Sequence, residues 1–232
     1  MRVIAVIAAG GRGNRFGGGV PKQFADLAGK TVLAWTLAAF EGAADVDEIV
    51  VVSAPERAVQ IRGMGGSKPL TVVPGGDTRQ SSVYGGLIAA REYGAEIAVI
   101  HDAARPLVSP ATIAANISAA RRHGAAVTAS PVADTLYLSD GAALRSVIPR
   151  AGLFAAATPQ SFALTDIIAA HERAAAAGIT DFTDDGSLFI DFGGGFPAVS
   201  PNTPENFKIT YPGDLEFSEL IIRSGYGEKV LP

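Results

Sequence analysis

Residues 3–23 read VIAVIAAGGRGNRFGGGVPKQ, an apolar run that passes directly into a glycine-rich loop. The run Val3–Ile7 is typical of a strand buried on both faces, as in a parallel sheet covered by helices. The loop carries Arg12, Arg15 and Lys22 among glycines whose backbone N–H groups can approach phosphate oxygens closely. Because open α/β sheets bind ligands at the carboxyl ends of their strands, this loop is predicted to hold a phosphorylated ligand.

Short β-branched runs alternate with Ala-rich segments of helical spacing up to residue 129. The expected strands are Val3–Ile7, Glu48–Ser53, Leu70–Val73, Ile97–Ile100 and Ala126–Ala129, and the expected helices are Thr31–Phe40, Ser81–Tyr93 and Pro110–His123. Ser109 is predicted to cap the helix that Pro110 begins, and Gly124 to follow its end. This alternation predicts a single α/β domain over residues 1–232, with a Rossmann-like, doubly wound, mostly parallel sheet.

The pattern changes after Pro131. Two short extended runs, Thr135–Leu138 and Leu144–Ile148, flank Ser139-Asp140-Gly141, and Asp-Gly between such runs favours a hairpin. Residues 133–150 are therefore expected to form a protruding β-hairpin arm, serving as a lid or reaching a partner subunit. Helical spacing returns over Leu164–Ala177, Asp184–Phe192 and Pro212–Arg223.

Composition excludes several classes of protein. Apolar residues make up 48% and charged residues 18%, and the mean hydropathy is +0.26, which argues against a disordered chain. The net charge of −4 gives no basic surplus for general binding of nucleic acid. Cysteine is absent, so disulfides and Cys-based zinc sites are excluded. The run Val3–Ala9 is too short to span a bilayer, and we expect a soluble cytoplasmic protein without membrane contact.

The glycine-rich loop fits two common phosphate motifs poorly. Gly11, Gly13 and Gly17 imitate a dinucleotide fingerprint, but the second strand ends in Val52-Ser53-Ala54, without the acid that binds the ribose. No Gly-Lys-Ser/Thr follows the glycines, as a P-loop requires. Binding of NAD(H) is therefore not expected. Arg15 followed by Lys22 fits a nucleoside triphosphate better, since two cations can stabilise the charge of departing pyrophosphate.

A carboxylate and a histidine close the strand that begins at Ile97. Asp102 there can hold Mg²⁺, or it can pair with Arg105 or cap the next turn, and the residues alone leave these alternatives open. We interpret His101 as structural, His123 and His171 as surface residues, and Asp184-Asp185 as a helix start.

Short motifs follow one another along nearly the whole chain. They are Ala8-Ala9-Gly10, Arg15-Phe16-Gly17, Pro21-Lys22-Gln23-Phe24, Gly75-Gly76-Asp77 with Arg79 and Ser82-Val83, His101-Asp102-Ala103-Ala104-Arg105-Pro106, Pro131-Val132 with Asp134-Thr135, Arg150, Thr158-Pro159-Gln160, Thr183-Asp184-Asp185, and Asn206-Phe207-Lys208-Ile209-Thr210. This series resembles the 2-C-methyl-D-erythritol 4-phosphate cytidylyltransferases. The glycine loop is one residue longer here, which leaves Arg12 or Arg15 as the phosphate-binding arginine; Arg15 keeps its register with Phe16 and Gly17.

The resemblance implies a role for each matching residue. Arg15, Lys22, Arg150 and Lys208 would be catalytic. Substrate would be bound by Ala8, Ala9, Gly10, Gly76, Asp77, Ser82, Asp102, Ala103, Arg105, Thr135 and Thr158. Asp102 would lie near the metal, with Mg²⁺ as cofactor. The arm would join two subunits of a homodimer and carry Arg150 into the neighbouring site.

The implied reaction transfers CMP from CTP to 2-C-methyl-D-erythritol 4-phosphate and releases pyrophosphate. D-ribitol 5-phosphate is the alternative acceptor, because related cytidylyltransferases share several of these motifs and residues 221–225 look similar to theirs. Ala8-Ala9-Gly10 favours methylerythritol. A nucleotide-binding protein that has lost turnover is the remaining alternative, and the presence of Arg15, Lys22, Arg150 and Lys208 together argues against it.

Overall fold

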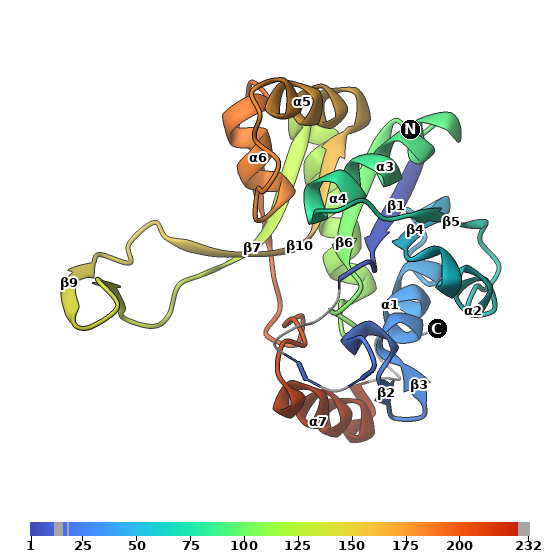
Figure 1. The fold of residues 1–232 in the computed structure, drawn as a ribbon, viewed down its shortest axis with the longest axis horizontal. Helices are drawn as coiled ribbons and strands as arrows, with labels where there is room; N and C mark the ends of the chain where they lie inside the picture. Colours follow the sequence, from blue (N-terminus) through green and yellow to red (C-terminus); the bar gives the residue numbers. More distant parts are fainter. Residues whose placement is uncertain (12–15, 18, 227–232) are drawn as a thin grey trace.

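Strand β1 lies inside a seven-stranded sheet with the order β11-β7-β10-β6-β1-β4-β5 (Figure 1). The computed structural model describes residues 1–11, 16–17 and 19–226. The strands of the sheet are β1 (Val3–Ala8), β4 (Glu48–Ser53), β5 (Leu70–Pro74), β6 (Ile97–Asp102), β7 (Ala125–Pro131), β10 (Phe154–Ala163) and β11 (Ala198–Pro201). β10 runs antiparallel to β6 and β7, and the other pairings are parallel. The predicted mostly parallel α/β sheet is confirmed.

Helices cover both faces of this sheet. They are α1 (Val32–Glu41), α2 (Ala58–Arg62), α3 (Arg79–Glu92), α4 (Pro110–His123), α5 (Leu164–Ala176), α6 (Asp185–Phe192) and α7 (Pro212–Ile221), with short turns η1 (Lys22–Phe24), η2 (Pro55–Arg57) and η3 (Ile222–Tyr226) and a small ribbon of β2 (Asp26–Leu27) and β3 (Lys30–Thr31). None of the helices in the described part of the chain has the length and apolarity needed to cross a bilayer.

The side chains of β1 alternate between two apolar cores. Ile7 packs in one cluster with Leu37 of α1 and Ile117 of α4, whereas Val6 packs in the other with Leu87 of α3. Each such buried side chain contributes about 1.5–3 kcal/mol relative to an exposed one. A Cβ at Gly86 of α3 would lie 2.5 Å from Val6 Cγ1, so a glycine is required where this helix approaches the sheet.

The observed helix ends lie at or near the positions predicted from the sequence. Ser109 accepts a hydrogen bond from the Thr112 N–H at the start of α4, and Gly124 ends the helix with φ +81°, as predicted. Helix α3 begins at Arg79, two residues before the predicted start, because the Thr78 hydroxyl accepts from the Ser81 N–H. This earlier start places Arg79 in the first turn, beside the cavity described below.

Strands β10 and β11 were not predicted. The segment Phe154–Ala163 is rich in alanine and contains Pro159, which demotes it as a strand by sequence rules. The register of β10 against β7 shifts between Ala156 and Gln160, which accommodates the proline. β10 carries Thr158 to the carboxyl end of β6, so the missed strand supplies part of the site.

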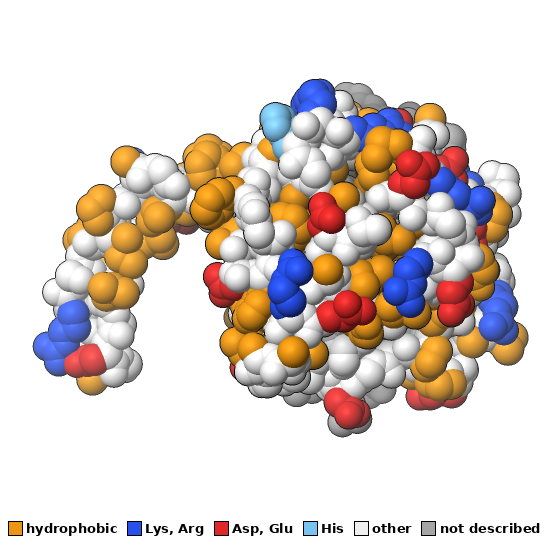
Figure 2. All heavy atoms as spheres, turned by 90° about the horizontal axis from the view of Figure 1, so that it is seen from above, with side chains coloured by type: hydrophobic (Ala, Val, Ile, Leu, Met, Phe, Trp, Pro, Cys, Tyr) orange, Lys and Arg blue, Asp and Glu red, His pale blue; other side chains and the backbone are white. Residues whose placement is uncertain are grey.

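The predicted hairpin forms an arm that stands clear of the body (Figure 1). It pairs β8 (Leu136–Ser139) with β9 (Leu144–Ile148), and Asp140 accepts hydrogen bonds from the backbone of the turn. Figure 2 shows hydrophobic side chains along the arm. The exposed large ones on the arm and at its base are Tyr137, Leu138, Leu144, Val147 and Phe154. This exposed apolar surface is typical of a protein–protein contact.

Candidate active site

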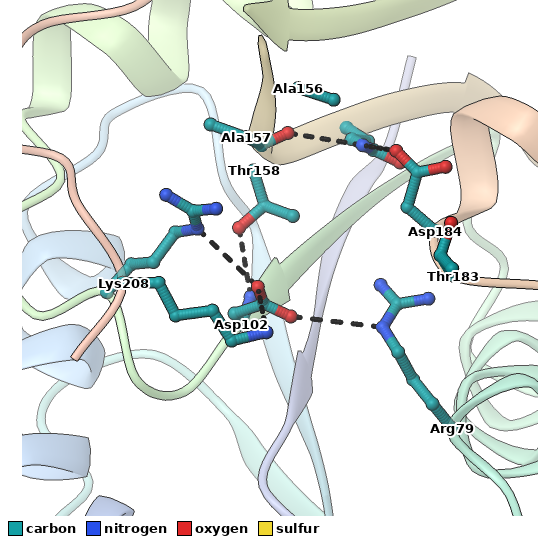
Figure 3. A pocket seen from close by; sticks show the side chains of 10 residues that line it. Arg79, Asp102, Ala156, Ala157, Thr158, Thr183, Asp184 and Lys208 are labelled. Atoms are coloured by element: carbon teal, nitrogen blue, oxygen red, sulfur yellow. Dashed lines mark hydrogen bonds and ion pairs between the residues drawn. The ribbon is translucent and has the colours of Figure 1, made fainter. Parts of the chain in front are cut away.

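A polar cavity of about 220 Å³ opens where β6 ends beside β10 (Figure 3). Its lining residues are Arg79, Asp102, Arg105, Ala156, Ala157, Thr158, Gln160, Thr183, Asp184 and Lys208. The cavity therefore lies at the carboxyl end of a central parallel strand, where open α/β sheets bind ligands. It brings together the predicted residues Asp102, Arg105, Thr158 and Lys208.

Asp102 is surrounded by three cations. Its Oδ2 lies 2.9 Å from Lys208 Nζ and 3.4 Å from Arg105 Nε, and its Oδ1 lies 3.9 Å from Arg79 Nε. Burial alone would raise the pKa of Asp102, but Lys208, Arg79 and Arg105 hold it well below its usual range. The carboxylate therefore stays charged and gathers three positive groups at one end of the cavity.

Behind Asp102, buried His101 joins two segments of the site. The Thr158 hydroxyl accepts from the Asp102 N–H at 3.1 Å and lies 3.0 Å from His101 Nδ1, while His101 Nε2 lies 3.2 Å from the Arg105 carbonyl. Because that carbonyl only accepts, we assign the proton to Nε2 and infer that the Thr158 hydroxyl donates to Nδ1. Thr158 thus lines the cavity, but its hydroxyl proton is donated to buried His101.

We expect acid to weaken the fold through His101. Burial lowers the pKa of His101 to about 4, against 6.5 for an exposed histidine. Between these pH values the unfolded chain binds more protons, so the free energy of unfolding falls as pH falls, by about 3 kcal/mol in total. Urea unfolding between about pH 7 and 4.5 measures this slope.

His101→Gln keeps one donor and one acceptor without titrating, and it should flatten the pH dependence. His123→Gln, at an exposed position, is the matched control and should leave the slope unchanged. Equal slopes in wild type and His101→Gln would contradict the assignment of a neutral buried imidazole.

The segment carrying Lys208 is tied to the rest of the site by backbone contacts. Asn206 is buried and donates from Nδ2 to the Thr158 carbonyl at 2.8 Å, while its own carbonyl accepts from Arg105 Nη1 at 2.7 Å. Lys22 Nζ donates to the Ile209 carbonyl at 2.6 Å. Lys22 therefore contacts the backbone of the residue that follows Lys208.

Several residues predicted to bind substrate lie at the ends of β1 and β6 and at the start of α3. The Ala8 carbonyl accepts from the Ala103 N–H at 3.2 Å, and the Ser82 hydroxyl accepts from the Gly76 N–H at 3.0 Å. A Cβ at Gly10 would lie 4.0 Å from the Ser82 hydroxyl, so the glycine backbone faces that side chain. Small residues thus leave space beside this backbone, which suits a planar base.

Gln23 stabilises the start of the glycine-rich loop. Its buried side chain donates from Nε2 to the Ala9 carbonyl at 2.7 Å and to the Gly11 carbonyl at 2.8 Å. The sequence indicated this residue only as part of Pro21-Lys22-Gln23. The structure gives it a definite role in holding the backbone next to the predicted nucleotide site.

Other predicted residues lie away from the cavity or outside the described residues. Arg15, with the alternative Arg12, falls outside the described residues. Arg150 and Thr135 are exposed on the arm, where Arg150 donates to the Ala133 carbonyl. Asp77 is exposed just before α3. Within one chain, the structure does not bring the arm residues to Asp102.

Several cavity residues were missed as site residues by sequence reasoning. They are Arg79, Gln160, Thr183 and Asp184, with Asp185 and His171 behind them and Asn206 beside them. Asp184 does cap α6, as predicted for a helix start. His171 is buried rather than exposed, because its face of α5 packs against Asp185 and Tyr84. The motif series already contained most of these residues.

The donor set does not fit a metal held by the protein alone. Within residues 1–11, 16–17 and 19–226, no three His, Cys, Asp or Glu side chains gather as a metal cage. A metal at Asp102 would compete with Lys208, Arg105 and Arg79 for its oxygens. One carboxylate acting together with substrate phosphates remains a usual arrangement for Mg²⁺.

Fold and site together define a nucleotidyltransferase of the α/β class. The family model described as IspD, 2-C-methyl-D-erythritol 4-phosphate cytidylyltransferase, matches residues 3–224. The chain belongs to this family.

Similar proteins span the same length or extend beyond it. The cytidylyltransferase of Cereibacter sphaeroides is 39% identical over 98% of this chain and 100% of its own. The bifunctional enzyme IspD/IspF of Maricaulis maris is 41% identical, but the match spans only 58% of that protein. The crystal structure of the Thermus thermophilus cytidylyltransferase has a TM-score of 0.76 at 35% identity, covering 96% of this chain and 100% of that one.

Proposed function

We propose that this chain transfers CMP from CTP to 2-C-methyl-D-erythritol 4-phosphate and releases pyrophosphate. The observation that carries the proposal is the group of Lys208, Arg105 and Arg79 around Asp102, whose strand β6 ends next to the end of β1. Such a cavity suits an acceptor with both a phosphate and hydroxyl groups, because it offers cations and a carboxylate together.

The reaction needs alignment and charge neutralisation more than proton transfer. A phosphate oxygen of the acceptor attacks the α-phosphorus of CTP, and the bond from that phosphorus to the β-phosphate oxygen breaks. The nucleophile is already an anion, so no general base is required. Lys208 holds the attacking phosphate, and Lys22 with Arg15 neutralises the departing pyrophosphate. Buried, neutral His101 supports the site without taking a proton.

Mg²⁺ enters this proposal with the nucleotide. A triphosphate supplies the oxygen ligands that this hard cation prefers, and Asp102 is the cavity carboxylate that the family resemblance assigns to the metal. The metal supplies further charge neutralisation at the phosphates when bound. The chain itself contributes the cations and the rigid backbone around them. A cytoplasmic location remains a prediction from the sequence.

A homodimer completes the proposed site. Arg150 and Thr135 lie on an arm that projects away from its own cavity, and apolar side chains on this arm are exposed. We infer that the arm packs on a second copy and places Arg150 beside the acceptor phosphate bound there. Residues 133–150 then serve both assembly and substrate binding.

Pyrophosphate release measures the proposed function directly. With CTP and Mg²⁺, methylerythritol 4-phosphate should be turned over with a kcat/KM at least about tenfold above that of D-ribitol 5-phosphate. A preference for ribitol phosphate would select the alternative acceptor. Binding of CTP without pyrophosphate release from either acceptor would indicate a nucleotide-binding protein that lacks turnover.

A further inference from the structure

A buried series of charged and polar groups leads from the cavity wall into the space between α3, α5 and α6. Arg79 Nη2 donates to Asp185 Oδ2 at 2.8 Å, and Asp185 Oδ1 lies 3.3 Å from His171 Nε2. On the cavity side, Arg79 Nε lies 3.9 Å from Asp102 Oδ1. Asp185 is 1% exposed and His171 is 3% exposed, so solvent reaches only the cavity end of the series.

Asp185 is placed at a point where a buried carboxylate can remain charged. It is the first residue of α6, where the helix dipole favours negative charge. Removing a carboxylate from water is unfavourable unless partners compensate, and here the Arg79 guanidinium does so, with Nη2 2.8 Å from Oδ2. The ring centroids of His171 on α5 and Tyr84 on α3 lie 5.8 Å apart, so the imidazole packs against α3.

Arg79 depends on this pair for its position. It is the first residue of α3, and a long side chain at a helix start has many rotamers available. The contact with Asp185 fixes its guanidinium beside Asp102, opposite Lys208 (Figure 3). Without the contact between Arg79 and Asp185, Asp102 would keep Lys208 and Arg105 as partners but lose its third cation.

We propose that Asp185, supported by His171, is a positioning residue that acts through Arg79 on the acceptor. This inference rests on the proposed function. Arg79 balances the charge of Asp102, which would otherwise repel the acceptor phosphate, and its guanidinium turns N–H donors toward the cavity. Asp185 itself contacts no substrate in this proposal.

Asp185→Asn keeps the shape of the side chain and removes its charge. We expect KM for the acceptor to rise roughly tenfold, as for loss of one charge-assisted contact, while KM for CTP changes less than about twofold. His171→Asn should raise KM for the acceptor in the same direction by a smaller factor. Asp166→Asn, at an exposed position on α5, is the matched control and should change neither constant.

A double-mutant cycle separates positioning from general loss of structure. If Asp185 acts through Arg79, then Arg79→Ala and Arg79→Ala/Asp185→Asn should have the same KM for the acceptor. The double variant also removes the unpaired buried carboxylate that Arg79→Ala leaves, which guards against a variant that fails to fold. Additive effects of the two substitutions, or equal rises in both KM values, would overturn the proposal.

A crystal structure of Asp185→Asn tests the same inference without turnover. The Arg79 guanidinium should move away from residue 185 and from Asp102. An arginine that keeps both positions overturns the positioning role, whatever reaction the wild type catalyses. Absence of pyrophosphate release by the wild type would instead count against the proposed function alone.

Discussion

A heterodimer that pairs an Arg150→Ala subunit with a Lys208→Ala subunit is expected to have about half of the wild-type activity. The activity of each variant homodimer is expected to be roughly 10²-fold lower than that of the wild type. The reason is geometric. Lys208 lies in the cavity of its own chain, 2.9 Å from Asp102, whereas Arg150 is exposed on the projecting arm. In the heterodimer, one cavity combines an intact Lys208 with an intact Arg150 from the other subunit. Differently tagged subunits, co-expressed and purified through both tags, provide the sample.

The reverse arrangement is the sharpest control. A heterodimer of wild type with the double variant Arg150→Ala/Lys208→Ala should be nearly inactive, because each cavity then lacks one of the two cations. If Arg150 served its own chain instead, this second heterodimer would keep half of the activity and the first would have none. Arg145→Ala, at the exposed end of the arm where Arg145 pairs with Asp140, should leave activity unchanged.

The parallel core could be predicted because its signals are local. Val3–Ile7 is a continuous β-branched run, and Ser109 with Pro110 marks a helix start through contacts inside one turn. Strand β10 gave no such signal, since its alanines and Pro159 have low strand propensity and tertiary pairing with β6 and β7 determines its conformation. Propensity therefore failed where neighbouring strands, rather than the segment itself, determine the structure.

In the candidate site too, contacts between residues close in sequence could be predicted, whereas contacts between distant residues could not. Asp102 and Arg105 are three residues apart, so their pairing was among the alternatives that the sequence left open. The contact between Arg79 and Asp185 joins residues 106 positions apart, and nothing in either segment indicates the other. His171 was assigned to the surface because it lies in a helical pattern, and that prediction was wrong. It is buried 3.3 Å from Asp185 Oδ1, a residue that only the fold brings near.

Lys22→Ala is expected to lower kcat by about 10²–10³ at saturating CTP and Mg²⁺, as for loss of one group that stabilises charge in the transition state. Lys22 begins η1, directly after the glycine-rich loop, and its Nζ donates to the Ile209 carbonyl at 2.6 Å. This contact directs the side chain toward the segment that carries Lys208.

The effect on kcat should exceed the effect on KM for CTP, because the charge on the leaving pyrophosphate increases as the bond breaks. Lys30→Ala is the matched control: Lys30 lies in the same part of the chain, exposed and 5.1 Å above the Trp35 ring, and its loss should leave kcat unchanged. Single-turnover measurement of pyrophosphate formation separates chemistry from product release. An unchanged rate of that step in Lys22→Ala would show that the ammonium only holds the Ile209 segment, and the departing charge would then need another cation.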